Sequence, residues 1–252
     1  MRPASRWAVV TGAGETWRRF RADVRAIPGG AWRRWGAILA IGLVACGAAS
    51  VGITILGRSW VANRGLQAWD ERWLLTIADV GPMSFPDAIL AESPGNLSYL
   101  IPLTLAVAVI AVRCHRPLVA VTILVSYWGV RPVVLAGWMT WDRGRPKLIA
   151  DGLAAPGLHS FPSGHAALAI AVYGFLAYLW IRQSRSLIER TLAVLLTAAW
   201  VTMVSVARVR LGSHWPSDIV SGAVIGVLWL AVVIVAFRYA EKRRVIASVD
   251  RG

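Results

Sequence analysis

The sequence predicts an all-α, polytopic membrane protein: a six-transmembrane-helix bundle with both termini cytoplasmic. Of its 252 residues, 57% are hydrophobic and only 16% are charged, which is unlike the composition of a soluble domain. The apolar residues form runs of roughly the 20 residues that a helix needs to cross a bilayer. The basic residues cluster in the connectors between these runs, where they set the orientation of a membrane protein.

Six apolar runs have spanning or near-spanning length. Backbone groups in lipid must form their hydrogen bonds within their own segment, so each run is expected to be a helix. Two runs are short for a hydrocarbon layer of about 30 Å and should extend into flanking polar residues. The runs fall at 36–57, 97–112, 117–138, 164–181, 191–206 and 217–237.

The distribution of arginine and lysine divides the chain into a membrane domain, 36–237, and two basic cytoplasmic segments, 1–35 and 238–252. With an even number of spans, the positive-inside rule puts both termini in the cytoplasm and the connectors 58–96, 139–163 and 207–216 outside. The first run is too long for the core of a cleaved signal peptide and reads as an anchor. The segment TWRRFRADVRAI fits either a basic helix on anionic lipid or a solvated tail that sets topology.

The longest outer connector, 58–96, is expected to contain an interfacial helix. Trp69, Trp73 and Ile77 recur at intervals of four and form an apolar stripe. Such a stripe favours packing against the bundle, and a lid over a substrate site is the alternative.

Several classes of function do not fit the sequence. The net charge of +14 is spread over connectors rather than gathered in a patch, so nucleic acid is not an expected partner. Cys46 and Cys114 have no spacing typical of a metal site or disulfide framework. The early TGAGE lacks the βαβ context of a dinucleotide site, and no cofactor or metal is predicted.

Three stretches with polar residues share the predicted outer side: WMTWDRGRPK (138–147), FPSGH (161–165) and ARVRLGSHWPSD (207–218). Guanidinium groups match phosphate oxygens two at a time, and imidazole titrates near neutral pH. Together the stretches therefore favour a phosphate-handling site. Their charged and titratable members are Arg143, Arg145, Lys147, His165, Arg208, Arg210, His214 and Asp218.

FPSGH indicates an anion seat at the start of a helix. Free backbone N–H groups attract an anion there, Gly164 permits close approach, and Ser163 adds a hydroxyl. His165 is suited to protonating a departing alkoxide. His214 and Asp218 stand four apart, so the carboxylate could orient the imidazole and leave its other nitrogen free to attack phosphorus.

Each piece alone also fits a structural role: a turn and cap, a surface pair, or interfacial arginine anchors. Their joint appearance on one side favours the phosphate site.

These residues resemble the type-2 phosphatidic acid phosphatase superfamily, whose motifs run Lys-x6-Arg-Pro, Pro-Ser-Gly-His and Ser-Arg-x5-His-x3-Asp. Residues 162–165 match the second motif completely, and Arg208, His214 and Asp218 match the third. Arg145-Pro146 matches the end of the first. The resemblance implies that His214 is the nucleophile, Asp218 its orienting partner and His165 the leaving-group acid. It also implies phosphate binding by Arg145, Arg208, Ser163 and the Gly164 amide, assisted by Arg143, without a metal.

Two positions depart from the family pattern. Trp138 stands where the family has lysine, and Ala207 stands where it has serine. Lys147 or Arg131 could compensate for the lost lysine. However, about 10 Å of helix rise separates Arg131 from Trp138, which favours pairing of Arg131 with a buried carbonyl. Asp142 would repel phosphate unless Arg143 or Arg145 neutralises it.

The resemblance implies a lipid phosphatase in the cell membrane with its active site on the extracytoplasmic side. Polyprenyl diphosphate, phosphatidate and phosphatidylglycerol phosphate are the expected kinds of substrate. The alternatives are a lipid phosphotransferase and a non-catalytic lipid-phosphate binder or transporter. The bilayer and the lipid substrate are the only partners expected, and no oligomeric state is predicted.

Overall fold

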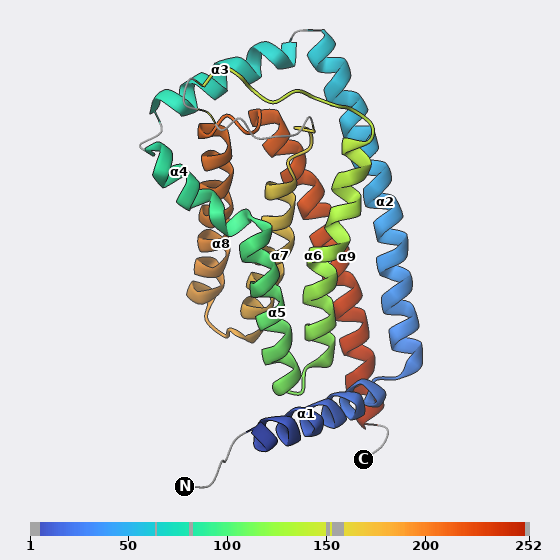
Figure 1. Cartoon of the computed structure of the whole chain (residues 1–252). Coiled ribbons are helices and arrows are strands. Elements are labelled where there is room, and N and C mark those ends of the chain that lie inside the picture. The colour runs from blue at the N-terminus through green and yellow to red at the C-terminus, as the bar shows by residue number, and fades with distance from the viewer. Residues whose placement is uncertain (1–5, 64, 81–82, 150–151, 153–158, 250–252) are drawn as a thin grey trace, which may run out of the picture.

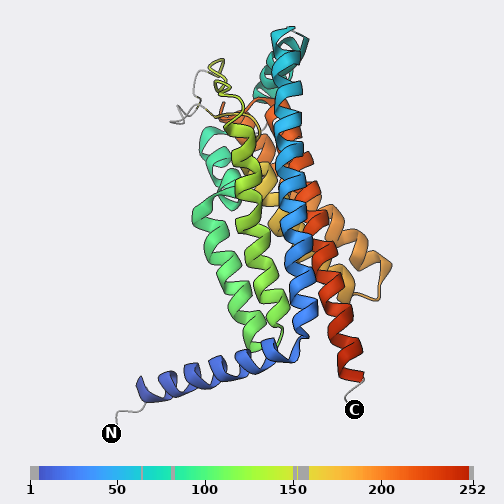
Figure 2. The same ribbon diagram turned by 90° about the vertical axis from the view of Figure 1, so that its right-hand side faces the viewer.

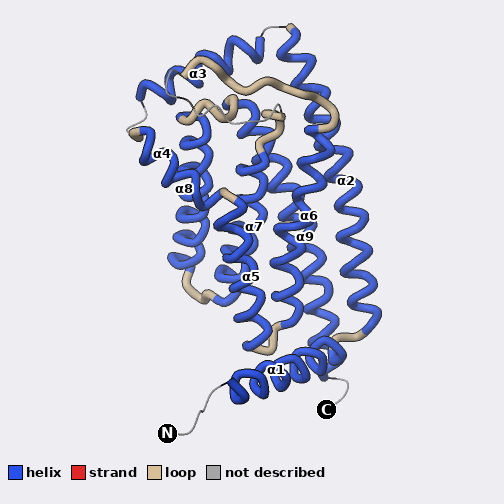
Figure 3. The backbone as a smooth tube through the Cα atoms, viewed as in Figure 1, coloured by secondary structure: helices blue, strands red, loops and turns tan. Residues whose placement is uncertain are grey.

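The computed structural model describes residues 6–63, 65–80, 83–149, 152 and 159–249, and all regular structure in these residues is helical (Figure 3). Helices α3 and α4 and the short turn η1 precede the motif-bearing half of the chain. The elements are α1 (Arg6–Ala26), α2 (Gly29–Ala62), α3 (Gly65–Val80), α4 (Phe85–Glu92), η1 (Ser93–Gly95), α5 (Leu97–Arg113), α6 (Pro117–Trp138), α7 (Gly164–Gln183), α8 (Leu187–Arg210) and α9 (Pro216–Val249).

Six stretches in the described part of the chain are long and apolar enough to cross a membrane, which confirms the predicted number. They are α2, the stretch Phe85–Arg113, α6, α7, α8 and α9 as far as Arg243. The second stretch begins earlier than the predicted residue 97 because α4 is apolar and nearly continuous with α5. Helix α2 has 34 residues, and its length of about 51 Å exceeds the hydrocarbon layer. Its polar ends therefore stay helical outside the apolar run.

The spans stand side by side, with transverse helices at both ends of the bundle (Figure 1). Helix α1 crosses one end of the bundle, close to the last turns of α9, and projects sideways from it (Figure 2). Of the two interpretations of the N-terminal segment, the structure has the helix. Helices α3 and α4 lie at the other end, together with the loop before α7 and the turn before α9, which carry the predicted site (Figure 1). The site is therefore at the opposite end of the bundle from both termini.

The connector 58–96 contains the expected helix, α3, but only one residue of the predicted stripe, Ile77, packs against the bundle. Trp69 and Trp73 are 40% and 45% exposed, whereas Asp70 and Leu74 are fully buried. Leu74 packs with Val209 and Trp215, and α3 contacts α2, α8 and α9. The apolar pattern pointed to the indoles of Trp69 and Trp73, which face outward. The true packing face was not recognised because it includes the carboxylate of Asp70 and so is not a continuous apolar stripe in the sequence.

Helix α9 is central to the bundle and packs against α2, α6 and α7. Buried polar bonds fix its register: Trp229 Nε1 donates to the Ser126 carbonyl at 3.0 Å, and Ser126 Oγ donates to the Ala171 carbonyl at 2.6 Å. Water is scarce in the hydrocarbon layer, so bonds of this kind hold α6, α7 and α9 in one arrangement.

The first turns of α9 lie against the start of α7 at unusually short range. A Cβ atom on Gly222 would lie 2.3 Å from the backbone oxygen of Ser163. Only glycine permits this approach. The position of α7 relative to α9 therefore depends on the missing side chain.

We expect Gly222→Ala to push α7 and α9 apart, because backbone rather than a flexible side chain must move. Overpacking of this kind costs about 1–3 kcal/mol. The melting temperature of the purified protein in detergent should fall, and activity at the site should fall with it. Gly52→Ala in α2 is the matched control, since nothing lies within 4 Å of its added Cβ. Equal melting temperatures for the two variants would contradict the prediction.

Candidate active site

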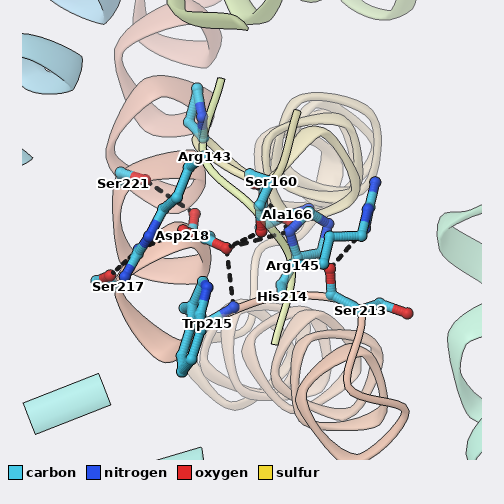
Figure 4. Close-up of polar contacts among 12 residues, drawn as sticks. Arg143, Arg145, Ser160, Ala166, Ser213, His214, Trp215, Ser217, Asp218 and Ser221 are labelled. Carbon is cyan, nitrogen blue, oxygen red and sulfur yellow. Dashed lines mark hydrogen bonds and ion pairs between the residues drawn. The ribbon is translucent and has the colours of Figure 1, made fainter. Parts of the chain in front are cut away.

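The three predicted stretches meet at one end of the bundle. Residues of the loop after α6, the N-terminus of α7 and the connection from α8 to α9 lie around His214 (Figure 4). The ring centres of His165 and His214 are 6.3 Å apart. Both histidines thus face one small space.

A tight turn at the end of α8 places His214. Gly212 has a φ of +64°, a left-handed conformation that suits glycine at a helix C-terminus. The amides of Leu211 and Gly212 donate back to Ala207 and Val209, both at 2.9 Å. The chain then reverses through His214, and Pro216 begins α9 as a first-turn residue.

The tautomer of His214 is set by a backbone carbonyl. Its Nδ1 lies 2.9 Å from the Ser160 carbonyl oxygen. A carbonyl only accepts, so Nδ1 carries the hydrogen and Nε2 holds the lone pair. The ring is 2% exposed, and His214 lines a cavity beside His165. An oriented nitrogen nucleophile has this geometry.

Asp218 supports this arrangement mainly through other groups. Its carboxylate lies 3.5 Å from His214 Nδ1, farther than the Ser160 carbonyl. One oxygen accepts from the Trp215 amide at 2.8 Å and from the Ser160 hydroxyl. Asp218 therefore fixes the Ser160 segment, which in turn fixes the imidazole.

The electrostatic environment favours neutral His214. Burial lowers its pKa below the ordinary value of 6.5; the hydrogen bond and charge of Asp218 act in the opposite direction, while Arg208 and Arg145 lower it further. At pH 7 the ring is neutral, and its lone pair is available. Burial and Arg208 also lower the pKa of Arg145, whose guanidinium nevertheless remains charged at any relevant pH.

Arg143, expected to assist in phosphate binding, is instead held by two carboxylates. Its Nη1 donates to Asp218 at 2.7 Å and to Ser217 at 2.8 Å, and its Nη2 donates to Asp70 at 2.6 Å. Arg143 is 4% exposed, and both aspartates are fully buried. An arginine was expected to bind an anion. The anions that Arg143 binds in this structure are the carboxylates of Asp70 in α3 and Asp218 in α9. Asp70 also accepts the Ser217 amide at 2.8 Å, near the start of α9.

Arg145 and Arg208 are the guanidiniums nearest the histidines. Arg145 lines the cavity and donates to the Ser213 carbonyl at 2.5 Å. Arg208 forms an ion pair through Nη1 with Glu92 from α4. Its Nε is buried and has no hydrogen-bond partner in the described structure. This nitrogen therefore retains a hydrogen that it can donate to a further acceptor.

The N-terminus of α7 has the expected residues. Ser163 is the N-cap, fully buried, and its Oγ accepts from the Ala166 amide at 3.4 Å. Gly164 and His165 line the cavity. His165 Nε2 lies 2.9 Å from Asn96 Oδ1.

The cavity has a volume of about 410 Å³ and an apolar wall from α5 and α6. Three wall residues, Leu97, Trp128 and Leu135, are 43%, 53% and 48% exposed on the outside of spanning helices. Side chains that face both the cavity and the surroundings mark a lateral opening between α5 and α6.

The two departures from the family pattern have structural explanations. Trp138 Nε1 donates to the Pro162 carbonyl at 2.9 Å and so ties α6 to the segment before Ser163. Ala207 is fully buried against Ala88 and Leu211, where α8 meets α4. Lys147, which could compensate for the lost lysine, is exposed and is not among the residues that line the cavity.

Two other charged residues are placed differently from expectation. Asp142 lies at the surface, 3.4 Å from His159, rather than against Arg143 or Arg145. Arg131 lines the cavity and donates to the Tyr127 hydroxyl at 3.3 Å rather than to a carbonyl.

Four contributors were missed by sequence reasoning: Asp70, Glu92, Asn96 and the carbonyl of Ser160. Three of them belong to the connector 58–96, whose charged residues were expected to face water. Acidic residues beside an apolar helix stripe were the available signal, since arginines that become buried need buried counter-charges. Among the described residues, no group of three or more His, Cys, Asp or Glu side chains is arranged to hold a metal ion.

Comparisons with known proteins identify the family and similar proteins. A family model described as the PAP2 superfamily matches residues 117–242, which is half of the chain. Phosphatidylglycerophosphatase B of Bacillus subtilis (strain 168) is 33% identical over 100 residues, covering 38% of this chain and 45% of that protein. The match thus spans less than half of the relative's length.

A solved structure is similar in fold. It is described as the first transmembrane PAP2 type phosphatidylglycerolphosphate phosphatase from Bacillus subtilis, and it matches with a TM-score of 0.62 at 21% identity. The match covers 73% of this chain and 94% of that one.

We expect Arg143→Met to destabilise the protein strongly, because it leaves Asp70 and Asp218 buried without their shared cation. Losing one partner of a buried ion pair costs about 3–5 kcal/mol. The melting temperature in detergent should fall well below that of Arg72→Met, an exposed control on α3. Adding Asp70→Asn to Arg143→Met should restore part of the loss, since it removes one unpaired charge. Additive losses in the double variant would contradict the shared-cation arrangement.

Proposed function

The chain belongs to the PAP2 superfamily, and from this membership and the site geometry we propose that it is a membrane lipid phosphatase that works through a phosphohistidine intermediate. The observation that carries the proposal is the His214 ring. Its Nδ1 is committed to the Ser160 carbonyl, and its Nε2 is unprotonated beside His165 and two arginines.

In the first step, the lone pair of His214 Nε2 attacks phosphorus while the bond from phosphorus to the lipid oxygen breaks. His165 gives a proton to that oxygen, so the lipid leaves as an alcohol, or as a lipid phosphate when the substrate is a diphosphate. The imidazole of His214 gains positive charge as the bond forms. Ser160 and Asp218 stabilise that charge from the Nδ1 side.

In the second step, water attacks the phosphohistidine and passes a proton to His165, which restores both histidines. Arg145, the unpartnered edge of Arg208, the Gly164 amide and the Ser163 hydroxyl hold the phosphoryl oxygens as charge moves among them. These groups supply positive charge without a metal ion. Arg143 contributes indirectly, by holding Asp218.

We place the site on the extracytoplasmic face. The N-terminal helix and the end of α9, both rich in arginine and lysine, lie at the opposite end of the bundle from the site (Figure 1). The positive-inside rule assigns the basic end to the cytoplasm. The lateral opening between α5 and α6 would let a lipid present its headgroup while its chains stay in the bilayer.

The preferred substrates carry a second phosphate on the lipid side of the scissile one, as in phosphatidylglycerol phosphate or a polyprenyl diphosphate. Arg131 supports this choice. It lies within a span, lines the cavity, lies 5.4 Å from the centre of the Trp128 ring and donates to the Tyr127 hydroxyl at 3.3 Å. Among the described residues it forms no ion pair. An arginine inside a membrane helix is costly and is usually kept for function.

The decisive test is phosphate release by the purified full chain. We expect His214→Ala to lower release by about a thousandfold or more, as for loss of a covalent nucleophile. His115→Ala, an exposed histidine in the connector from α5 to α6, should retain activity. With labelled substrate, wild type should form an acid-labile, alkali-stable phosphoenzyme that His214→Ala lacks. Full activity of His214→Ala would refute the nucleophile assignment.

The same assay separates the alternatives. The panel comprises polyprenyl diphosphate, polyprenyl phosphate, phosphatidate and phosphatidylglycerol phosphate, each with and without a chelator. Unchanged rates with chelator are expected if guanidiniums replace a metal. Transfer of the label to an added alcohol instead of water would favour a phosphotransferase, and tight binding without release from any substrate would favour a binder or transporter.

We expect Arg131→Leu to lower kcat/KM for phosphatidylglycerol phosphate by about 10-fold or more, the size of one lost charged hydrogen bond. Activity on phosphatidate, which has no second phosphate, should change much less. Arg113→Leu, exposed at the far end of α5, is the control. Equal losses on both lipids would show that Arg131 has no part in selecting the substrate.

A further inference from the structure

The turn between α4 and α5 reaches the histidine predicted to act as acid. Asn96 follows η1, and its Oδ1 lies 2.9 Å from His165 Nε2. An amide oxygen accepts, so Nε2 carries a hydrogen. No hydrogen bond to the other ring nitrogen, Nδ1, is present in the described structure, and His165 lines the cavity.

The side chain of Asn96 is not used for its usual local purpose. Asn96 is the N-cap residue of α5, with extended φ and ψ of −76° and 152°, yet its side chain makes no capping hydrogen bond. Asparagine is among the best N-cap residues because its oxygen normally accepts from the first turn. Here that oxygen binds His165 instead.

The turn is anchored on both neighbouring helices. Tyr173 of α7 donates to the Pro94 carbonyl at 2.9 Å, and Glu92 at the start of the turn pairs with Arg208 of α8. Pro94 and Gly95 are buried. The Asn96 amide is therefore held in place against the imidazole rather than resting there by chance.

We infer that Asn96 is the positioning residue of the leaving-group acid: by accepting the Nε2 hydrogen of His165, it directs Nδ1 at the oxygen that leaves. This inference rests on the proposed function. His165 enters the reaction as imidazolium, with a hydrogen on each ring nitrogen. As His214 attacks, the bond from phosphorus to oxygen breaks and the leaving oxygen takes the Nδ1 proton. His165 is then neutral, and its Nε2 hydrogen is still bonded to Asn96. The amide oxygen stabilises the ring while it is protonated. Asn96 acts through His165 and does not itself contact the substrate.

The test compares leaving groups. An alkyl lipid phosphate needs a proton on its departing oxygen, whereas 4-nitrophenolate departs without one. Asn96→Ala in the full-length protein should lower kcat for the lipid by about 10- to 100-fold, as part of the usual effect of a general acid. Its kcat for 4-nitrophenyl phosphate should change by less than about 3-fold. Asn96→Asp, which keeps an acceptor oxygen, should retain most of the lipid activity.

Two controls separate positioning from a structural role. Ser93→Ala lies in the same turn, where Ser93 Oγ donates only to the Ile89 carbonyl, and should leave both activities unchanged. In a His165→Ala background, Asn96→Ala should cause no further loss, because Asn96 acts only through that ring. Equal losses on the two substrates, or additive losses with His165→Ala, would overturn the inference while leaving the phosphatase assignment intact. A wild type that releases no phosphate from either substrate would instead refute the proposed function and this inference with it.

Discussion

Arg143 lies between two buried carboxylates that come from opposite halves of the chain. Removing such charges from water costs several kcal/mol per ion, so the arrangement is stable only when every partner is present. Through their ion pairs with Arg143, Asp70 ties α3 and Asp218 ties α9 to the loop after α6. Asp218 then holds Ser160, and Ser160 holds the ring of His214. The orientation of the proposed nucleophile, His214, thus depends on a contact with Asp70, which lies outside the three motifs.

The spans and the location of the site could be predicted because both depend on local properties. Apolar length defines a span, and an anion seat is recognisable from a helix start with Ser163, Gly164 and His165. The partners could not be predicted in the same way. Arg143 and Asp70 are 73 positions apart, and nothing near either residue indicates the other. An arginine has the same sequence appearance whether its anion is a phosphate or a carboxylate, and only the fold decides which lies beside it.

The proposed site combines a neutral nucleophile with nearby fixed positive charge. Burial keeps His214 unprotonated, while Arg145 and Arg208 remain cationic within range of it. The neutral state of His214 depends on exclusion of water, and its ring is 2% exposed. The arginines stay cationic despite burial, because a guanidinium is protonated at any relevant pH. The apolar wall of the cavity continues to the exposed surfaces of α5 and α6. A polar reaction centre and an apolar lipid chain can therefore be accommodated within one cavity.

The region matched by the family begins at residue 117, whereas Asp70, Glu92 and Asn96 all precede it. Each of these three binds a residue within the matched region: Asp70 binds Arg143, Glu92 binds Arg208 and Asn96 lies against His165. The motif residues are thus held by side chains that the family match does not include. A chain trimmed to the matched residues would keep every motif and lose these three contacts.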